Sequence, residues 1–532
     1  MSIGELERNL IQRVCVGDIV ARAAAHYPDK VGIIDGQLRL TYRHFNEVVN
    51  RTGHALLSLG LNHQDRVAIA SRNTWEFLAI YFACAKAGLI AMPVNLGLKP
   101  AEIAYCLRDS NAKVLLAETV LSHAVAQVAP LAPDLEHVIW LRSGSDVPAV
   151  EKTYGAFESL LTAGNPAEVE RVVSDRDVIQ LLYTSGTTSM PKGVLTSHVA
   201  VVMTAFSAAL RQKSDPNDVV MHVLPLFHCA QLNSLAIPAF VNGATSVILP
   251  SFDVNRVAEE LEQHRVSSVL LLPMMYQALL SHPGVQRRNY SSVRYAIYAM
   301  APMPESRISE IQALFPNAKV LLGSGQTEFT PPTTFQFPEH QQTKAASWGP
   351  AAPSVWVEIM DDHGRLLPRG ETGEIVYRGP NAMEGYWNQP EKTLEAFHHG
   401  WFHSGDVGYM DDEGVVWFTD RKKDMVKTGG ENVASLEVER KLLEHPDVAE
   451  AAVVGLPHDR WGEAVTGLVI LKEGRSPSEQ DIIAYCKTTL ADFKVPKRIH
   501  FVTEFPRTGT GKIQKHELRA HFKTMYQEKS PS

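Results

Sequence analysis

The sequence predicts an α/β protein in which a large N-terminal domain of βαβ-type sheets, with a small antiparallel-strand subdomain, precedes a small α+β C-terminal domain. Three observations predict this class. Short apolar runs alternate with helical patterns over most of the chain, as in βαβ units around parallel sheets. After about Gly370 the runs become short, alternating and glycine-rich, which is typical of antiparallel strands. The last stretch carries strand and helix patterns of its own.

The parallel strands are predicted from the apolar runs. These runs are residues 67–70, 91–94, 114–117, 179–182, 247–249, 269–272 and 320–322. The antiparallel strands are predicted at residues 374–377 and 415–419, where apolar and polar side chains alternate. Loops rich in Gly, Ser and Thr follow some of the parallel runs. Because ligands in open α/β sheets bind beyond the carboxyl ends of strands, we expect the active site at those loops.

The C-terminal part has its own elements, a strand at residues 451–454 and a helix after it. The segment Ser476-Pro477-Ser478-Glu479 reads as a capping box with proline at the first helical position. Ile482, Ile483, Cys486 and Leu490 then give the helix one apolar face. The charged segment 420–424 separates the two patterns, and we expect the domain junction there.

Composition excludes several classes of protein. With 532 residues the chain is too long for one ordinary core, and 45% apolar with 21% charged residues is typical of a globular enzyme. A net charge of -8 gives nucleic acid little electrostatic support as a partner. Five dispersed cysteines without a CxxC pair indicate reduced thiols. Neither a signal-peptide pattern nor a membrane-length apolar run is present, so we expect a cytoplasmic protein without an integral membrane segment.

The most informative loop is residues 183–193, which follows the apolar run 179–182. Its small residues let successive backbone N–H groups turn toward one anion, its hydroxyls add donors, and Lys192 supplies a point charge. This pattern indicates a polyphosphate site. It differs from the P-loop of the NTPases, because Lys192 is followed by Gly193 and not by Ser or Thr. An ordinary surface loop is the alternative reading of a Ser/Thr/Gly stretch taken alone.

This loop resembles the signature loop of the adenylate-forming superfamily, which includes acyl-CoA synthetases, luciferases and peptide-synthetase adenylation domains. Further segments resemble the motifs of that family in the same order, at residues 224–228, 323–328, 403–408, 420–430 and 506–515. The resemblance implies an ATP-dependent acid:CoA ligase. Such an enzyme activates a carboxylic acid as acyl-AMP with release of pyrophosphate, then forms acyl-CoA and AMP, with Mg²⁺ as its metal.

The resemblance also implies roles for single residues. Lys512 matches the lysine that reaches the attacking carboxylate and the α-phosphate, Glu328 matches the Mg²⁺ ligand, and Thr184 matches a residue close to the metal. His228 matches the position at the entry of the acid. We therefore expect Lys512, Thr184, Glu328 and His228 to be the catalytic group. Taken alone, His228 could equally be a satisfied core residue.

The nucleotide site follows in the same way. Asp406 matches the aspartate that accepts both ribose hydroxyls, a geometry that suits a carboxylate with two oxygens, and Arg421 matches a second nucleotide contact. Taken alone, these residues would be read as a turn residue and a linker charge. The implied ATP and AMP contacts are Thr184, Ser185, Gly186, Thr187, Thr188, Lys192, Ala301, Pro302, Gly323, Ser324, Gly325, Gln326, Thr327, Asp406, Arg421 and Lys512.

The family changes the pose of its C-terminal domain between the two half-reactions, so the resemblance implies a mobile domain here. We expect an ATP- and acid-binding domain at residues 1–420, a hinge at 421–423 with Lys423 as the hinge residue, and a mobile domain at 424–532. The thioester step would then use Lys427, Gly429, Gly430 and Glu431, since glycines permit close backbone contact with a thin thiol arm. An ordinary tight turn is the alternative at Gly429 and Gly430.

The class of acid is predicted from the residues around His228. Relatives that activate amino acids carry an aspartate where His228 stands, so an amino-acid substrate is disfavoured. The implied acyl pocket is lined by His228, Cys229, Ala230, Ser234, Ala299, Met300, Phe329 and Thr330. These small or apolar side chains favour a fatty acid, with an aryl or aryl-propenoic acid as the nearest alternative. Three departures from the family pattern stand at Ser324, where an aromatic usually stacks on adenine, at Met300 and at Ser189.

Two other functions stay open. The enzyme could stop at the adenylate and pass it to a carrier protein, or the chain could bind nucleotide without turnover. Glu328, Asp406 and Lys512 are all present, which argues against the second. The expected partners are small molecules, namely the acid, ATP and coenzyme A, together with a second copy of the chain in a homodimer.

Overall fold

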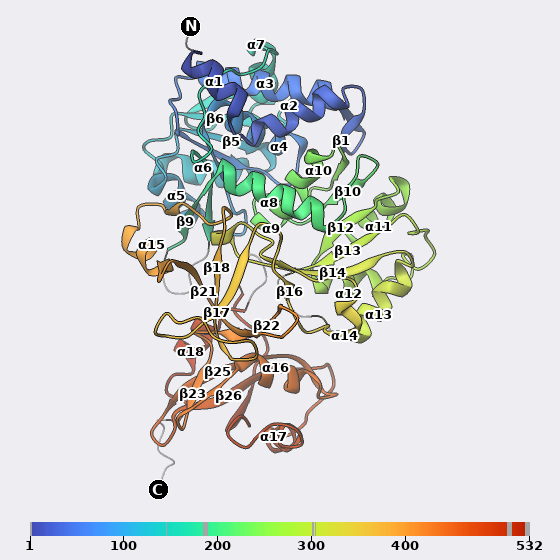
Figure 1. Cartoon of the computed structure of the whole chain (residues 1–532), viewed down its shortest axis with the longest axis vertical. Helices are drawn as coiled ribbons and strands as arrows, with labels where there is room; N and C mark the ends of the chain where they lie inside the picture. The colour runs from blue at the N-terminus through green and yellow to red at the C-terminus, as the bar shows by residue number, and fades with distance from the viewer. Residues whose placement is uncertain are drawn as a thin grey trace.

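The computed structural model describes residues 3–144, 146–184, 190–299, 303, 305–507 and 513–526. Within these ranges the strands form four sheets, two of eight strands, one of six and one of five. Figure 1 shows the elements up to β22 in the upper and middle part and the C-terminal unit, with α16 to α18, at the lower end. The predicted α/β class with a smaller C-terminal domain is confirmed.

The first sheet is parallel over most of its width. In spatial order its strands are β19 (Gly385–Tyr386), β9 (Lys192–Ser197), β8 (Val178–Thr184), β4 (Ile90–Pro93), β3 (Arg66–Ala70), β5 (Val114–Glu118), β6 (His137–Leu141) and β7 (Thr153–Ala156). Strands β8, β4, β3, β5, β6 and β7 run parallel, whereas β9 pairs antiparallel with both β8 and β19. Helices of its part of the chain are α1 (Glu5–Gln12), α2 (Gly17–His26), α3 (Tyr42–Ser58), α4 (Trp75–Ala87), α5 (Pro100–Asp109), α6 (Ser122–Val128) and α7 (Phe157–Ala163).

The second sheet has a parallel centre and antiparallel edges. Its order is β15 (Thr334–Phe335), β14 (Lys319–Ser324), β13 (Tyr295–Tyr298), β12 (Ser268–Leu271), β10 (Val219–His222), β11 (Thr245–Ile248), β1 (Val31–Asp35) and β2 (Leu38–Thr41). Its helices are α8 (His198–Arg211), α9 (Cys229–Gln231), the π-helical turn η3 (Leu232–Ala236), α10 (Ile237–Val241), α11 (Val254–Gln263), α12 (Pro273–Ser281) and α13 (Glu305–Leu314).

The six-stranded third sheet is antiparallel, as predicted for the region after Gly370. It consists of β16 (Gly349–Pro350), β22 (Val415–Arg421), β21 (Trp401–Met410), β18 (Gly373–Arg378) and β17 (Trp356–Met360), with β20 (Phe397–His398) on β21. The short helices α14 (His340–Thr343) and α15 (Pro390–Ala396) lie in its connections. β17 begins before Gly370, so the antiparallel region starts earlier than the pattern indicated.

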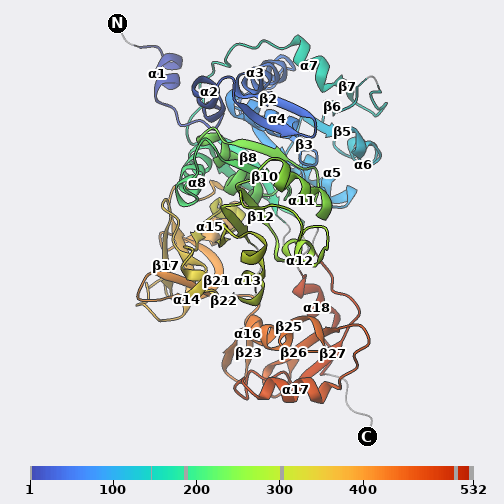
Figure 2. The same ribbon diagram turned by 90° about the vertical axis from the view of Figure 1, so that its right-hand side faces the viewer.

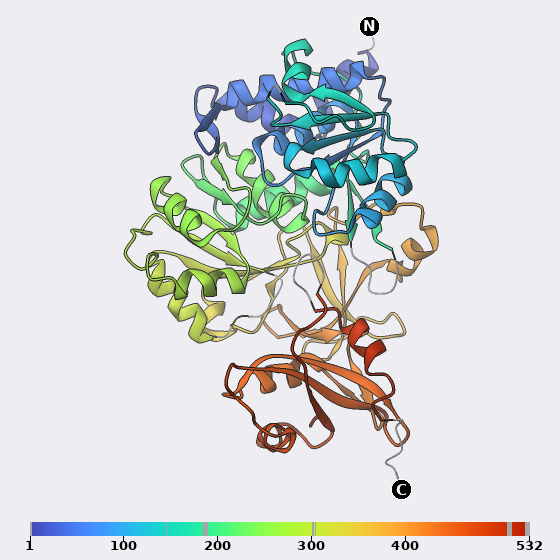
Figure 3. The ribbon, with the colours of Figure 1, turned by 180° about the vertical axis from the view of Figure 1, so that it is seen from behind.

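The C-terminal unit contains the fourth sheet and three helices within the described residues. Its strands are β24 (Glu431–Val433), β23 (Val426–Thr428), β26 (Gly462–Leu471) and β25 (Val448–His458), with β27 (Arg498–Phe501) beside β26, and its helices are α16 (Ser435–Leu443), α17 (Glu479–Lys487) and α18 (Lys515–His521). Figures 2 and 3 show α18 on the side of this unit that faces the rest of the chain.

The predicted strands are confirmed, with boundary shifts of a few residues, but the predicted helix cap was wrong. Helix α17 begins at Glu479, and its cap is Ser478, whose hydroxyl accepts from the Asp481 N–H. Ser476 and Pro477 therefore precede the helix. Ile482, Ile483 and Cys486 lie in the core of the unit, as the pattern predicted, but Leu490 lies beyond the end of the helix at Lys487.

The main core lies between the two eight-stranded sheets, around α4. All of α4 except Trp75 is buried, and its apolar side chains pack with residues of both sheets and of α3. All five cysteines are free thiols and buried. In the described part of the chain, every helix is too short or too polar to cross a bilayer.

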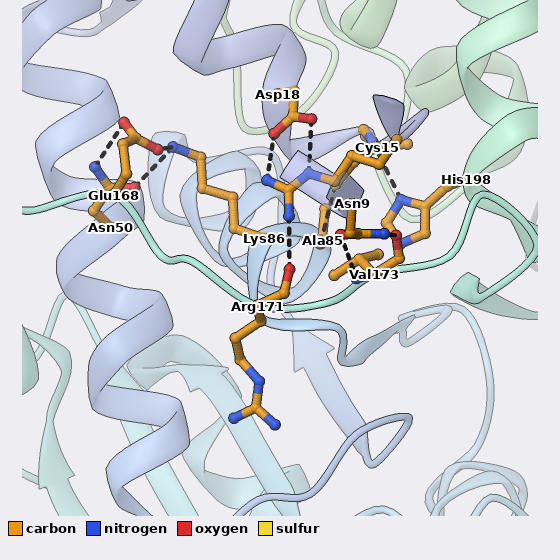
Figure 4. Close-up of polar contacts among 12 residues, drawn as sticks. Asn9, Cys15, Asp18, Asn50, Ala85, Lys86, Glu168, Arg171, Val173 and His198 are labelled. Carbon is orange, nitrogen blue, oxygen red and sulfur yellow. Dashed lines mark hydrogen bonds and ion pairs between the residues drawn. The ribbon is translucent and has the colours of Figure 1, made fainter. Parts of the chain in front are cut away.

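A polar cluster fixes the chain that leads into β8 (Figure 4). The Lys86 ammonium, 1% exposed, donates to Glu168 at 2.6 Å, and Arg13 donates to the Arg171 carbonyl at 2.8 Å. Burial lowers the pKa of His198 to about 3, so its neutral ring accepts the Val16 N–H. Because these groups lie on separate elements, they hold the N-terminal segment and the chain before β8 against α4.

Candidate active site

The phosphate-loop candidates lie at the end of an antiparallel hairpin. Thr184 and Lys192 face each other as the last pair of β8 and β9, and the Thr184 hydroxyl donates to the Lys192 carbonyl at 3.5 Å. Strand structure therefore extends further into the loop than predicted from the run 179–182. Ser185, Gly186, Thr187 and Thr188, with Ser189, lie outside the described residues.

Glu328 lies in the short helical turn η4 (Thr327–Phe329), close to the start of β9. The Tyr386 hydroxyl donates to Glu328 Oε1 at 3.1 Å, and the Met383 N–H donates to the Glu328 carbonyl at 2.9 Å. On the other side, Lys192 Nζ lies 5.2 Å from the centre of the Tyr386 ring. The structure thus brings the phosphate-loop lysine and the metal-ligand candidate together around a tyrosine.

Burial and neighbouring charges shift the pKa values of Lys192 and Tyr386. Burial lowers the pKa of Lys192, with a further contribution from Lys392, whereas Glu328 raises it. Burial and the Glu328 carboxylate both raise the pKa of Tyr386, so its phenol stays a donor at neutral pH. Sequence reasoning missed Tyr386. Its strand β19 has only two residues, Gly385–Tyr386, which is too short for a periodic pattern.

The adenine-side candidates follow β14. Gly323 and Ser324 end the strand and pair with β15, and the Ser324 carbonyl accepts the Thr333 N–H at 2.8 Å. Gln326 Nε2 is buried and has no hydrogen-bond partner among the described residues, so it offers a donor to a bound molecule. Ala301 and Pro302, with Met300 of the acyl pocket, lie outside those residues.

Asp406 and Arg421 are paired across β21 and β22, and Arg421 Nε lies 3.7 Å from Asp406 Oδ1. The turn before Asp406 is held by Glu374 of β18, which accepts the Gly405 N–H at 3.0 Å and lies 3.2 Å from His403 Nδ1. Lys422 also contacts Glu374, at 3.1 Å. Burial alone would raise the pKa of Glu374, but these partners lower it to about 2.

The acid-side candidates gather around the start of α9. His228 caps α9, with Nδ1 accepting the Ala230 N–H at 3.2 Å, and Cys229 Sγ lies 3.3 Å from the Thr327 hydroxyl. The Ser234 hydroxyl, in the π-helical turn η3, donates to the Pro331 carbonyl at 2.9 Å. Such turns inside helices are frequent at functional sites. Thr327 therefore joins the nucleotide candidates to the acid candidates.

The apolar candidates separate into two groups. Ala230 and Ala299 pack in one cluster with Leu235, Tyr295 and other residues of the second sheet. The ring of Phe329 instead packs against Tyr377 and Phe402, 5.2 and 5.5 Å between ring centres, in the core of the third sheet. Thr330 is fully buried, and its carbonyl accepts the Thr204 hydroxyl at 3.0 Å.

A second residue that sequence reasoning missed, Asn73, fixes the loop before His228. The buried Asn73 side chain donates to the Leu224 carbonyl at 2.8 Å and accepts the Leu226 N–H at 2.7 Å. Asn73 lies between β3 and α4, far away in the sequence. Only the folded chain brings it to this loop, so no local pattern signals its role.

Lys512 and most of its loop lie outside the described residues, whereas α18 directly after it is described. Lys515 donates to Ser435 and lies 2.7 Å from Glu439, both on α16. Lys423, the hinge candidate, is exposed just after β22.

The thioester-step candidates form a tight hairpin. Gly429 and Gly430 have φ values of +60° and +88° between β23 and β24, as a two-residue hairpin turn requires, and Lys427 and Glu431 flank them with exposed side chains. A Cβ added at Gly430 would meet no atom within 4 Å. The turn is therefore open on the Gly430 side.

The donor set around Glu328 fits Mg²⁺. No group of three or more His, Cys, Asp or Glu residues suited to a metal occurs in the described part of the chain. Mg²⁺ keeps several waters and is usually held by one or two carboxylates together with substrate phosphates, so Glu328 beside the phosphate hairpin matches that need. Glu328 would hold the metal, and Thr184, the last residue of β8, is the second candidate.

Comparison with known proteins identifies the family. The model of the AMP-binding enzymes matches residues 20–387, and the model of the AMP-binding enzyme C-terminal domain matches residues 437–512. The chain belongs to the AMP-binding enzyme family. This confirms the resemblance seen in the motifs.

Individual AMP-binding enzymes match over nearly their full length. The chain is 34% identical to indoleacetate--CoA ligase of Aromatoleum aromaticum, covering 94% of this chain and 96% of that protein. It is 34% identical to long-chain-fatty-acid--CoA ligase FadD13 of Mycobacterium tuberculosis, covering 91% and 93%. It is 32% identical to the fatty acid--[acyl-carrier-protein] ligase ScoC of Streptomyces coeruleorubidus, covering 94% and 95%.

Among solved structures, ATP-bound MatB from Rhodopseudomonas palustris superposes with a TM-score of 0.85 at 28% identity, covering 96% of this chain and 99% of that one. The chain is an AMP-forming acid:CoA ligase of the AMP-binding enzyme family. Ligases of this class use ATP, coenzyme A and Mg²⁺.

Proposed function

We propose that this ligase activates a fatty acid. The observation that carries the proposal is the apolar cluster behind the acid-side candidates, in which Ala230 and Ala299 are continuous with Leu235 and Tyr295. Its other members are apolar as well: Val220, Leu224, Ala239, Ala244, Leu270, Ile297, Leu321 and Phe335, with Leu272 and Met275 against them. Such apolar surroundings suit an alkyl tail, which needs no polar partner.

In the first half-reaction, a carboxylate oxygen of the acid forms a bond to the α-phosphorus of ATP while the bond to the bridging oxygen breaks and pyrophosphate leaves. We assign the phosphates to Thr184, Lys192 and the loop 185–188 between them, and the ribose to Asp406 with Arg421. Charge builds on the phosphate oxygens, so fixed cations and N–H donors should carry most of the catalysis. Mg²⁺ on Glu328 would supply further positive charge there when bound.

The remaining nucleotide contacts are assigned to the segment after β14. Gly323 to Thr327 would line one side of the nucleoside, and the unpaired Gln326 amide supports a polar contact there. Ala301 and Pro302 are assigned to the nucleotide on the resemblance alone. Ser324 would leave adenine without a stacked ring on its face, since serine has no aromatic surface.

In the second half-reaction the thiol of coenzyme A loses its proton and attacks the acyl carbonyl carbon, and AMP leaves. We assign the pantetheine contact to the hairpin with Lys427, Gly429, Gly430 and Glu431. Its open, glycine-containing turn supports this role.

Two poses of the C-terminal domain fit these assignments. The domains would be residues 1–420 and 424–532, with a hinge at 421–423 in which Lys423 is the hinge residue. In one pose Lys512 enters the adenylation site, and in the other the Gly429–Gly430 turn approaches it. Helix α18 contacts α16, whereas the β23–β24 hairpin belongs to the sheet of the same unit. These separate positions support a change in which face of the C-terminal unit meets the active site.

Two alternatives each have support. An aryl or aryl-propenoic acid is favoured by the similarity to an indoleacetate--CoA ligase, and transfer of the adenylate to a carrier protein by the similarity to ScoC. Pyrophosphate release is measured across a panel of fatty and aryl acids, with and without coenzyme A, and each product is identified by mass spectrometry. These measurements distinguish the proposal from both alternatives. A fatty acyl-CoA product supports the proposal, and an aryl-CoA or an unconsumed adenylate contradicts it.

We also place the enzyme in the cytoplasm as a homodimer without a nucleic-acid partner. The free, buried thiols and the net charge of -8 support the compartment and the lack of nucleic acid. Light scattering of the purified protein tests the dimer, and a monomeric mass contradicts it.

A further inference from the structure

We propose that Tyr386 is a positioning residue for the phosphate end of the site: it orients the Glu328 carboxylate and holds the Lys192 ammonium over its ring. The proposal rests on the proposed function, because it gives Glu328 and Lys192 their roles. The decisive observation is that one side chain contacts both candidates, by a hydrogen bond of 3.1 Å on one side and a ring contact of 5.2 Å on the other.

The backbone fixes Tyr386 relative to Lys192. Strand β19 pairs with β9, the strand that begins at Lys192, so that Tyr386 lies opposite Val194. The Trp387 N–H donates to the Gly193 carbonyl and the Glu384 N–H to the Leu195 carbonyl, each at 2.8 Å. These bonds attach both ends of the short strand to β9 of the β8–β9 hairpin.

Further contacts fix the same segment to the rest of the fold. The Tyr386 N–H donates to the Thr393 hydroxyl at 2.9 Å, and the Trp387 indole donates to the Asp109 carbonyl at 2.7 Å. Glu328 is held on its own side by the Met383 N–H. Because Met383 and Tyr386 belong to one stretch of chain, that stretch sets both the backbone and the carboxylate of Glu328.

The chemistry of the contact suits a ligand support. A phenol donates one hydrogen bond, which occupies one lone pair of Oε1 and leaves the other carboxylate lone pairs for a cation. Hydrogen bonds to ligating carboxylates fix their orientation, and their loss typically costs 10–100-fold in metal affinity. The face of the same ring attracts the Lys192 ammonium. A residue that only filled the core would need neither contact.

Two variants separate the two contacts. Tyr386→Phe removes the hydroxyl and keeps the ring, and Tyr386→Leu removes both. We measure the dissociation constant of ATP by equilibrium binding, with and without Mg²⁺, and the Mg²⁺ concentration that half-saturates pyrophosphate release. Tyr276→Phe is the matched control, because it removes a buried phenolic hydroxyl that donates to the Ile297 carbonyl at 2.9 Å in the core of the second sheet.

For Tyr386→Phe we expect the half-saturating Mg²⁺ concentration to rise about tenfold, with metal-free ATP binding and the KM of the acid unchanged. For Tyr386→Leu we expect metal-free ATP binding to weaken about threefold in addition. An unchanged Mg²⁺ requirement in Tyr386→Phe overturns the proposal, as does an equal change in Tyr276→Phe. If no acid in the panel supports pyrophosphate release by the wild type, the proposed function fails, and the binding measurements still decide the role of Tyr386.

Discussion

The Lys515 ammonium donates to the Ser435 hydroxyl at 2.7 Å, and that hydroxyl donates to Asp420 at 2.7 Å. Asp420 lies on β22, next to Arg421, whereas Ser435 begins α16 and Lys515 begins α18. The three side chains therefore connect the third sheet to the helix that follows the Lys512 loop. Lys515 also lies 2.7 Å from Glu439, which is 8% exposed.

The Lys515→Met variant should have a lower unfolding free energy than the wild type and should form the acyl adenylate more slowly. It leaves the buried Glu439 carboxylate without its cation, which should cost about 3 kcal/mol of unfolding free energy. The double variant Lys515→Met/Glu439→Gln removes both charges and should recover most of that stability. If Lys515 also positions the Lys512 loop, pyrophosphate release stays about tenfold slow in the stable double variant. Urea unfolding and pyrophosphate release measure the two effects. Full recovery of the rate would mean that Lys515 acts through stability alone.

Lys512→Ala should abolish acyl-adenylate formation and leave thioester formation from a supplied acyl adenylate largely intact. The lysine would neutralise the attacking carboxylate and the α-phosphate only in the first pose. Pyrophosphate release reports the first half-reaction, and acyl-CoA formed from synthetic acyl-AMP reports the second. Lys523→Ala, an exposed lysine just after α18, is the matched control. Equal loss of both half-reactions in Lys512→Ala would refute the two-pose proposal.

The sequence predicted the strands well because their apolar runs are buried on both faces, as in β3 and β5. It failed where distant parts of the chain decide the outcome. Ser476 and Ser478 each precede an acidic residue by three positions, so the pattern allows either cap, and in the fold the reciprocal bonds form between Ser478 and Asp481. For the candidate site, the motifs indicated Glu328 and Lys192, whereas Tyr386 between them depends on a pairing of β19 with β9 that no local pattern shows.

Glu374 should make the stability of the enzyme depend on pH. Its pKa is about 2 in the folded protein against an ordinary 4.5, because His403, the Gly405 N–H and Lys422 outweigh the effect of burial. Because the pKa of this carboxyl is lower in the folded than in the unfolded protein, its contribution to the unfolding free energy is fully present above the unfolded pKa. That contribution is lost as the pH falls toward the folded pKa. The shift corresponds to about 3 kcal/mol, lost progressively below about pH 5.

Glu374→Gln should therefore be less stable than the wild type at pH 7, and the difference should shrink between pH 5 and pH 3. Urea unfolding at several pH values measures it. Because Glu374 also accepts the Gly405 N–H beside Asp406, we expect weaker ATP binding in the same variant at neutral pH. A stability difference that stays constant down to pH 3 would mean that the carboxylate is not stabilised by these partners.

The Ala299→Leu variant should reduce the maximum chain length of the acids that the enzyme accepts. Ala299 follows β13 and packs against the apolar cluster that contains Ala230 and Tyr295, so three added carbon atoms would fill space that an alkyl tail needs. We expect kcat/KM for long-chain acids to fall at least about tenfold, while that for butyrate changes less than about threefold, since one methylene in such a pocket is worth roughly 1 kcal/mol or more. Pyrophosphate release across acids of increasing length measures both.

Ala101→Leu on the exposed surface of α5 makes the same change away from the cluster and should leave kcat/KM for the whole series unaltered. An equal loss of kcat/KM for acids of every chain length in Ala299→Leu would mean that the alkyl tail binds elsewhere. That result would remove the main support for a fatty-acid substrate.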